Sequence, residues 1–145
     1  MIAKGRELTS LAAVEATLRG CQVVAVLGCH SEPSRPAHYV PAYLHQKGKT
    51  ILPVNPRLVG TVLFGQTTVA RCDELGVPVD VVDVFRKSAD VAGHVDEILA
   101  MRPLPRLVWL QSGIENDEAC AAFQAAGIDV VQDRCMLADG RALGI

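Results

Sequence analysis

Aromatic side chains are scarce in this chain: Phe, Trp and Tyr make up 4% of its 145 residues, whereas hydrophobic residues of all kinds make up 50%. Val, Leu and Ala must therefore build the core, and valine-rich runs are typical of a parallel sheet that is covered on both faces. Basic residues are not in excess either, since the formal net charge is −2. This balance provides no positive field that would attract nucleic acid, so we expect no nucleic-acid partner.

Long hydrophobic runs are also missing, because no apolar stretch reaches transmembrane length. The N-terminal residues are polar and charged where a secretory signal would be apolar. We therefore expect a cytoplasmic protein with no membrane partner. The cysteines number five, and no Cys-x-x-Cys pair occurs among them. Reduced thiols are the expected state, and the scattered histidines predict no metal site.

The most informative stretch covers residues 21–43. Residues 23–27 form an unbroken apolar run that ends at Gly28, which predicts a strand buried on both faces. A turn of small and polar residues follows. Pro36 then suits the first turn of a helix, where its missing N–H has no partner in any case. The positive end of that helix favours a phosphate beside the turn, although the same geometry also serves as a plain connection in many α/β proteins.

Strand and helix patterns alternate along the chain. Expected strands are 23–27, 50–54, 67–70, 79–85, 107–110 and 128–131, and expected helices lie within 8–18, 36–47, 88–101 and 116–126. Thr9 or Ser10, Ser88 and Asn116 are the expected helix caps. The alternation predicts a three-layer α/β fold with a doubly wound, mostly parallel, Rossmann-like sheet. We expect one domain over residues 1–145, with an N-terminal helix in 1–20, the Rossmann-like core in 21–135 and a tail in 136–145.

In such a sheet, ligands bind beyond the carboxyl ends of the strands, where the strand order switches. The residues expected there are 28–31, 54–57, 85–86, 111–113 and 133–135. NAD is the obvious first candidate, but the first turn holds one glycine instead of the three of the dinucleotide fingerprint. The second strand ends in Asn55, where NAD-binding proteins usually place an acid for the ribose hydroxyls. Asn55, Pro56 and Arg57 suit a different nucleotide, such as one with a phosphate on its ribose.

Several motifs follow one another in a specific order. They are Gly28 with Ser31, Pro33-x-Arg35-Pro36, Pro53-Val54-Asn55-Pro56, Val81-Val82-Asp83-Val84-Phe85-Arg86, Trp109-Leu110-Gln111-Ser112-Gly113 and Asp133-Arg134-Cys135. Together they resemble the small, single-domain CoA-binding protein family, over nearly the whole chain after the first helix. The fold of that family is similar to the CoA-binding domain of the succinyl-CoA synthetase α subunit.

The resemblance implies coenzyme A as the cofactor, with its diphosphate on the turn after the first strand and its adenosine between the second and fourth strand ends. The cofactor-binding residues that it implies are Gly28, Cys29, His30, Ser31, Pro33 and Arg35 around that turn, Val54, Asn55, Pro56 and Arg57 on the ribose-phosphate side, Phe85 and Arg86 beside the adenine, and Gln111, Ser112 and Gly113 along the pantetheine arm. No catalytic residue follows from it, because the larger synthetases use a phosphorylated histidine on a second domain.

Some of these residues also have a structural interpretation. Arg35 can clamp a phosphate or be a solvated residue before a helix, and Phe85 can flank the ligand or belong to the core. Asp83, inside a valine-rich strand, is expected to be satisfied by backbone groups or by Arg134. A minority hypothesis gives Cys29 or Cys135 a mixed disulfide with CoA under oxidation.

No nucleophile, base and orienting group form a catalytic set in this sequence. We therefore expect a protein that binds CoA or an acyl-CoA as a carrier, sensor or regulatory module, more readily than an enzyme. One alternative is a non-catalytic or partner-dependent subunit of an acyl-CoA ligase or transferase. Another is an NAD(P)-binding redox regulator. A protein partner or a homo-oligomer is compatible with this sequence.

Overall fold

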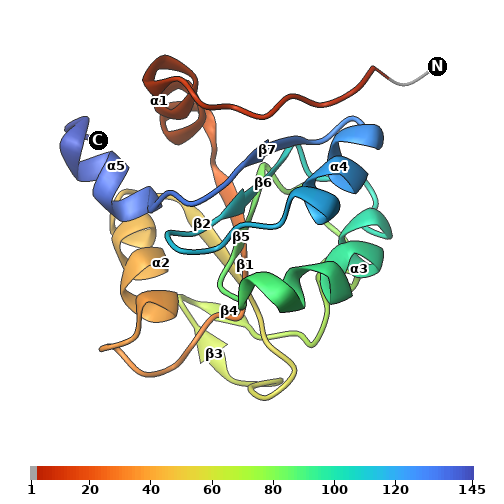
Figure 1. The fold of residues 1–145 in the computed structure, drawn as a ribbon. Helices are drawn as coiled ribbons and strands as arrows, with labels where there is room; N and C mark the ends of the chain where they lie inside the picture. Colours follow the sequence, from red (N-terminus) through yellow and green to blue (C-terminus); the bar gives the residue numbers. More distant parts are fainter. Residues whose placement is uncertain (1–2) are drawn as a thin grey trace.

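The computed structural model describes residues 3–145 and confirms an α/β fold built on a parallel sheet of five strands (Figure 1). The strands of this sheet are β1 (Val23–Leu27), β2 (Thr50–Val54), β5 (Val81–Val84), β6 (Leu107–Leu110) and β7 (Asp129–Val131). They pair in the order β2-β1-β5-β6-β7. The chain builds outward from β1 in one direction and from β5 in the other, so the carboxyl ends of β1 and β5 form the switch point of a doubly wound sheet.

Helices cover both faces of the sheet (Figure 1). The helices α1 (Leu11–Gly20), α2 (Pro36–Gln46) and α5 (Met136–Ala142) contribute to one core cluster, and α3 (Val95–Leu99) and α4 (Asp117–Ala125) contribute to the other. Alternate strand residues supply the two clusters: Val24 and Val26 face α2, whereas Ala25 and Leu27 face α3 and α4. Both clusters are mainly aliphatic, as the scarcity of aromatic residues predicts.

The first helix begins later than its apolar spacing predicts. Ser10 is the cap, because its side chain accepts a hydrogen bond from the Ala13 N–H at 3.2 Å. Leu8 lies before the helix, in an extended segment, and its N–H donates to the Val130 carbonyl at 2.8 Å. This segment covers the edge strand β7, which would otherwise expose unpaired backbone groups. Leu11 is consequently 56% exposed and is not part of a buried stripe.

The strand predicted at 67–70 is wrong. The segment instead contains an antiparallel pair, β3 (Val62–Leu63) and β4 (Gln66–Thr67). Phe64 and Gly65 have φ angles of 54° and 78°, and two successive residues of positive φ make the tight reverse turn of a hairpin. Val69 keeps only an isolated parallel bridge to Val54.

Two further expectations about chain segments need correction. Ser88 does not cap the next helix: its Oγ accepts from the Glu115 N–H at 3.0 Å and its carbonyl accepts from Asn116 Nδ2 at 2.9 Å. The chain there forms a 3₁₀ helix, η2 (Ser88–His94), before α3. The tail, to which the sequence assigned no definite structure, forms α5, with Met136 fully buried. Asn116 caps α4 as predicted and accepts from the Ala119 N–H at 2.9 Å.

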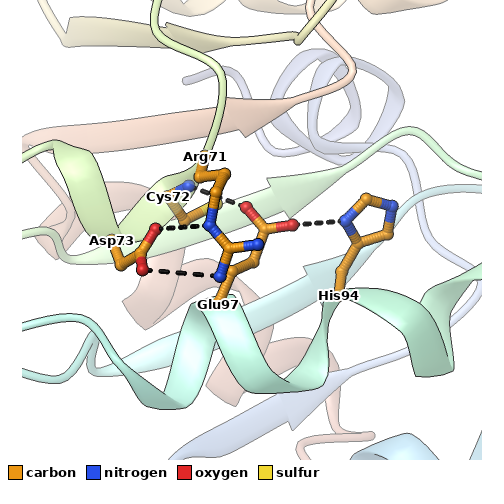
Figure 2. A network of polar contacts seen from close by, with 5 residues as sticks. All are labelled: Arg71, Cys72, Asp73, His94 and Glu97. Atoms are coloured by element: carbon orange, nitrogen blue, oxygen red, sulfur yellow. Dashed lines mark hydrogen bonds and ion pairs between the residues drawn. The ribbon is translucent and has the colours of Figure 1, made fainter.

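A polar network ties the loop before β5 to α3 (Figure 2). Glu97 is 5% exposed, and its Oε2 accepts from the Cys72 N–H in the short 3₁₀ helix η1 (Cys72–Glu74) at 2.7 Å. Its Oε1 lies 2.5 Å from His94 Nδ1. Burial acts to raise the pKa of Glu97, but the hydrogen bonds with His94 and Cys72 outweigh it and hold that pKa below 4.5. Arg71 and Asp73 form an exposed ion pair beside the network.

The variant Glu97→Gln should lower the free energy of unfolding at neutral pH by about 1–2 kcal/mol, because the charge on a hydrogen-bonded carboxylate is lost. Folding lowers the pKa of Glu97, so its contribution is present above about pH 4.5 and disappears as the pH falls through the folded-state pKa. Urea unfolding at about pH 7 and about pH 4 measures both effects. The exposed Glu74→Gln is the control. Equal acid sensitivity in wild type and Glu97→Gln would contradict this role.

Candidate ligand-binding site

A pocket with a volume of about 500 Å³ opens at the switch point of the sheet. We call it the switch pocket. Its walls come from the turn after β1, the start of α2, the segment after β5, the loop after β6 and the residue before α5. The lining residues are Gly28, His30, Arg35, Pro36, Ala37, Tyr39, Val40, Phe85, Arg86, Lys87, Gln111, Ser112, Ile114 and Cys135.

Gly28 lies at the floor of the turn, and two features require a glycine there. Its φ is +90°, and a Cβ would come within 2.4 Å of the Phe85 carbonyl oxygen. The same Cβ would be 3.2 Å from a guanidinium nitrogen of Arg86. The Gly28 N–H donates to the Val54 carbonyl at 2.8 Å. Gly28 thus joins the ends of β1, β2 and β5 and leaves the Arg86 guanidinium close to the turn.

A proline inside α2 holds the turn in place. Pro41 has no N–H, so the Ala37 carbonyl one turn earlier lacks its usual helical donor. The His30 N–H donates to this carbonyl at 3.1 Å instead. His38 Nδ1 lies 2.7 Å from the His30 carbonyl and adds a second connection. The sequence analysis missed this role. The signal was present, because a proline one turn inside a predicted helix leaves the carbonyl four residues earlier without its helical donor.

Few backbone donors remain at the start of α2. Pro36 has none, and the N–H groups of His38 and Tyr39 donate to the Arg35 carbonyl at 2.9 and 3.0 Å. Among residues 3–145, no backbone carbonyl outside α2 accepts from the N–H groups of Ser31 and Ala37. These two groups, close to the positive end of α2, are the backbone donors that an anion can use.

The switch pocket is positively charged. Arg35, Arg86 and Lys87 line it, and no Asp or Glu is among its lining residues within the described chain. This is a local feature, because the chain as a whole has a net charge of −2. The His30 ring adds a donor, since its Nδ1 accepts from the Glu32 N–H at 2.9 Å and the neutral ring must then carry its proton on Nε2. A concave site with several cations and no counter-charge favours a ligand with several negative charges.

A second pocket, of about 340 Å³, lies at the opposite edge of the sheet, beneath α1. It brings Arg6 and Arg106 together with Asp80 and Asp129. Arg106 already approaches Asp80 at 3.8 Å. Because its charges are mixed, this pocket has no comparable preference for an anion.

The structure brings part of the predicted site into the switch pocket. The predicted residues that line it are Gly28, His30, Arg35, Phe85, Arg86, Gln111 and Ser112. Sequence reasoning missed Lys87, which directly follows Arg86, and Tyr39, which lies on α2 and is 44% exposed. The other lining residues that it did not predict are Pro36, Ala37, Val40 and Ile114, whereas Cys135 was expected at a strand end near the ligand.

The remaining predicted residues lie beside the pocket and not in its lining. Asn55 links two turns: its Nδ2 donates to the Cys29 carbonyl at 2.9 Å, and its Oδ1 accepts from the Arg57 N–H at 3.0 Å. The Arg57 side chain is exposed. The Gly113 N–H donates to Asp133 Oδ1 at 2.6 Å. The others are Ser31, Pro33 and Pro56, which are exposed, and Val54, which is buried in the core.

Cys29 is fully buried, with 0% of its surface exposed. Burial raises the pKa of its thiol to about 12, and the nearby Asp83 adds to the shift. The hypothesis of a reactive Cys29 is therefore wrong. Cys135 does line the switch pocket. The side chain of the neighbouring Arg134 is engaged elsewhere, because its guanidinium bonds both carboxylate oxygens of Asp139 at 2.8 and 2.9 Å.

Asp83 also differs from its predicted role. Its hydrogen-bond partner is Gln111, whose Nε2 donates to Asp83 Oδ1 at 2.7 Å. Within residues 3–145 no backbone group bonds it, and the Arg134 side chain is directed to α5 instead. A buried carboxyl group of β5 is thus connected to a residue that lines the pocket.

Fold and site together define a Rossmann-like α/β protein with a cationic pocket at its switch point. The family described as "CoA binding domain" matches residues 22–141, and the chain belongs to this family. No helix within residues 3–145 has both the length and the apolar character that a bilayer crossing requires.

The chain is similar to several known proteins over most of its length. It is 31% identical to the uncharacterized protein YneT of Bacillus subtilis over 127 residues, which is 88% of this chain and 91% of that protein. The solved structure of cell-free ID.343 from Thermus thermophilus is 47% identical, with a TM-score of 0.87, and the match covers 93% of this chain and 99% of that one. A hypothetical protein from Pyrococcus horikoshii OT3 is 25% identical, with a TM-score of 0.85, over 99% of this chain and 100% of that one.

Proposed function

We propose that this protein binds coenzyme A or an acyl-CoA in the switch pocket and acts as a carrier, sensor or regulatory module without chemistry of its own. One observation carries the proposal: Arg35, Arg86 and Lys87 line the same pocket as Gly28, and no Asp or Glu lines it within residues 3–145. CoA has a diphosphate and a ribose phosphate, so it presents several negative charges along one edge. Membership in the CoA binding domain family supports the same ligand.

The diphosphate has its best place at the turn after β1. The free N–H groups of Ser31 and Ala37 lie there, and the start of α2 adds its dipole. The Arg86 guanidinium is close to Gly28 and can form paired hydrogen bonds with phosphate oxygens. We therefore assign Arg86 to the diphosphate, and Phe85 and Tyr39 are the aromatic residues of the pocket that can contact the adenine.

The ribose phosphate is assigned to Arg57. Asn55 holds the Arg57 backbone next to the turn after β1, and the exposed Arg57 side chain is available to a ligand. Gln111, Ser112 and Ile114 then offer a mixed polar and apolar path for the pantetheine arm. A strand end with Asn55 in place of an acid also speaks against NAD.

A binding role is favoured over an enzymatic one. Within the described lining of the switch pocket, Cys135 and Ser112 have no hydrogen bond to a base that would activate them. Nucleophilic catalysis needs such a contact, so the chain by itself supports recognition of the ligand and not its conversion.

Mass spectrometry of ligand released from the purified protein tests the proposal directly, and we expect CoA or an acyl-CoA. Calorimetry with CoA, dephospho-CoA and NAD tests it quantitatively, with the tightest binding expected for CoA. Equal affinity for all three ligands would overturn the assignment of a ribose-phosphate contact.

The variant Arg57→Ala should weaken CoA by roughly ten- to a hundredfold, because a charge-assisted hydrogen bond contributes about 1.5–3 kcal/mol. Its affinity for dephospho-CoA should stay nearly unchanged, since that ligand lacks the ribose phosphate. Calorimetry with the two ligands provides the comparison within one variant. A similar loss for both ligands would show that Arg57 does not contact the ribose phosphate.

A further inference from the structure

A buried carboxyl group lies next to the switch pocket. Asp83 is in β5, and 0% of its surface is exposed. Val81, two residues earlier, belongs to the core cluster on the side of α2 and α5. Asp83 faces the same side, because alternate residues of a strand share a face. Residues of α2 line the switch pocket, so Asp83 and the pocket lie on one side of the sheet.

Within residues 3–145, the side chain of Asp83 has a single hydrogen bond, and it comes from a residue of the pocket. Gln111 Nε2 donates to Asp83 Oδ1 at 2.7 Å. Asp83 Oδ2 is buried, and no group within residues 3–145 bonds to it. Gln111 is 4% exposed and lines the switch pocket. Gln111 Nε2 bonds Asp83, so the other polar atom of the amide, Oε1, is the one that a ligand can contact.

An ionised carboxylate is poorly stabilised in this place. A single donor reaches it, and a buried charge needs several. Burial accordingly raises the pKa of Asp83 to about 8, although the Gln111 hydrogen bond opposes the shift. The neutral acid needs only one acceptor, for the proton that it carries. Gln111 Oε1 supplies this acceptor when the side-chain amide rotates by a half-turn, which exchanges the positions of Oε1 and Nε2. Gln111 Nε2 then faces the pocket.

We propose that Asp83 is a positioning residue for the ligand: as a neutral acid it holds Gln111 with its amide N–H groups toward the switch pocket, and loss of its proton turns the carbonyl oxygen toward the pocket instead. The inference rests on the proposed binding of CoA. An additional hydrogen-bond donor in the pocket increases the affinity for a ligand with several negative charges, and a buried negative charge nearby decreases it. Binding is therefore strongest while Asp83 is protonated.

Other groups on the elements around Asp83 carry charge or titrate. Beside the pocket they are Cys29 and His30 after β1, Arg35 before α2, Tyr39 on α2, Arg86 and Lys87 after β5, and Cys135 before α5. The charge of Asp83 acts on the Cys29 thiol directly. Because the pKa of that thiol is raised to about 12, Cys29 keeps its proton while Asp83 titrates. The thiol and phosphates of CoA titrate as well. Comparison with Asp83→Asn at each pH removes all contributions that the two proteins share.

The test measures the Kd of CoA by calorimetry at about pH 6.5 and about pH 9.5, on either side of the Asp83 pKa of about 8. In the wild type we expect binding to weaken about tenfold more than in Asp83→Asn, since a ligand-linked shift of one pKa unit is tenfold in affinity. The asparagine side chain of this variant has the shape of the neutral acid, and its Nδ2 can donate to Gln111 Oε1 at every pH. The same ratio of Kd values in both proteins would overturn the proposal.

NMR of the ligand-free protein tests the same coupling without CoA. The side-chain amide signals of Gln111 should move with the titration of the Asp83 carboxyl carbon in wild type and stay constant in Asp83→Asn. The proposal would be overturned if the pKa of Asp83 were near its ordinary value of 3.8, or if the Gln111 signals did not change as Asp83 titrates. If CoA binds at no pH, the proposed function fails, and the NMR titration still decides whether Asp83 controls the Gln111 amide.

Discussion

Replacing Arg86 by alanine should weaken the binding of CoA by about ten- to a hundredfold while the protein stays folded. The guanidinium lies close to Gly28, at the point where the strand order switches. It lines a pocket that has no acidic residue in the described part of the chain, so the ligand is its natural partner. A hydrogen bond with a charged group contributes about 1.5–3 kcal/mol, which corresponds to that range of affinities.

Arg106→Ala is the matched control for Arg86→Ala. It removes the same charge from the amino edge of the sheet, where the Arg106 side chain is 86% exposed. Calorimetry with CoA and thermal unfolding of both variants separate binding from stability. A loss of affinity of the same size in both variants would mean that net charge, and not a contact at the switch pocket, governs binding.

Replacing Gly28 by valine should destabilise the fold itself, by about 2–5 kcal/mol, through backbone strain and overpacking. The φ of +90° disfavours any side chain, and a Cβ would come within 2.4 Å of the Phe85 carbonyl oxygen. That oxygen belongs to the backbone at the end of β5 and has little freedom to move. Urea unfolding of the ligand-free protein measures the loss.

The variant Gly48→Val separates the cost of backbone strain from the cost of overpacking. Gly48 has the same φ of +90°, but nothing lies within 4 Å of a Cβ at that position. It should therefore show the cost of strain alone, at about 1–3 kcal/mol, and Gly28→Val should exceed it. If both variants lose the same stability, the close approach of β5 is not what requires Gly28. A loss of CoA binding in Gly28→Val would in either case not identify a phosphate contact, because the turn is altered as well.

The parallel sheet was predictable because its signal is local. Each strand is a short apolar run bounded by Gly, Pro or polar residues, and residues 23–27, 50–54 and 107–110 became strands over those bounds. The capping function of Asn116 was equally predictable, since a cap is a contact between residues three apart. Errors arose where distant segments meet. Leu8 left the helical pattern because its backbone pairs beside β7, more than a hundred residues later.

The candidate site shows the same division. Gly28, Arg35 and Arg86 could be selected from the sequence, because strand ends collect at one edge of a parallel sheet. How these residues lie relative to one another could not be predicted from the sequence. That Arg86 lies beside Gly28 depends on the pairing of β1 with β5, which are separated by the whole of α2 and β2.

The sequence by itself determined the class of fold, the strand-turn-helix unit around Gly28 and the family, because these depend on local patterns and on the order of motifs. Only the tertiary structure decided that Gln111, and not Arg134, bonds Asp83. It also decided that Cys29 is sealed in the core whereas Cys135 lines the pocket. Burial and hydrogen-bond partners are set by segments far apart in the chain, and no spacing along a single strand or helix contains that information.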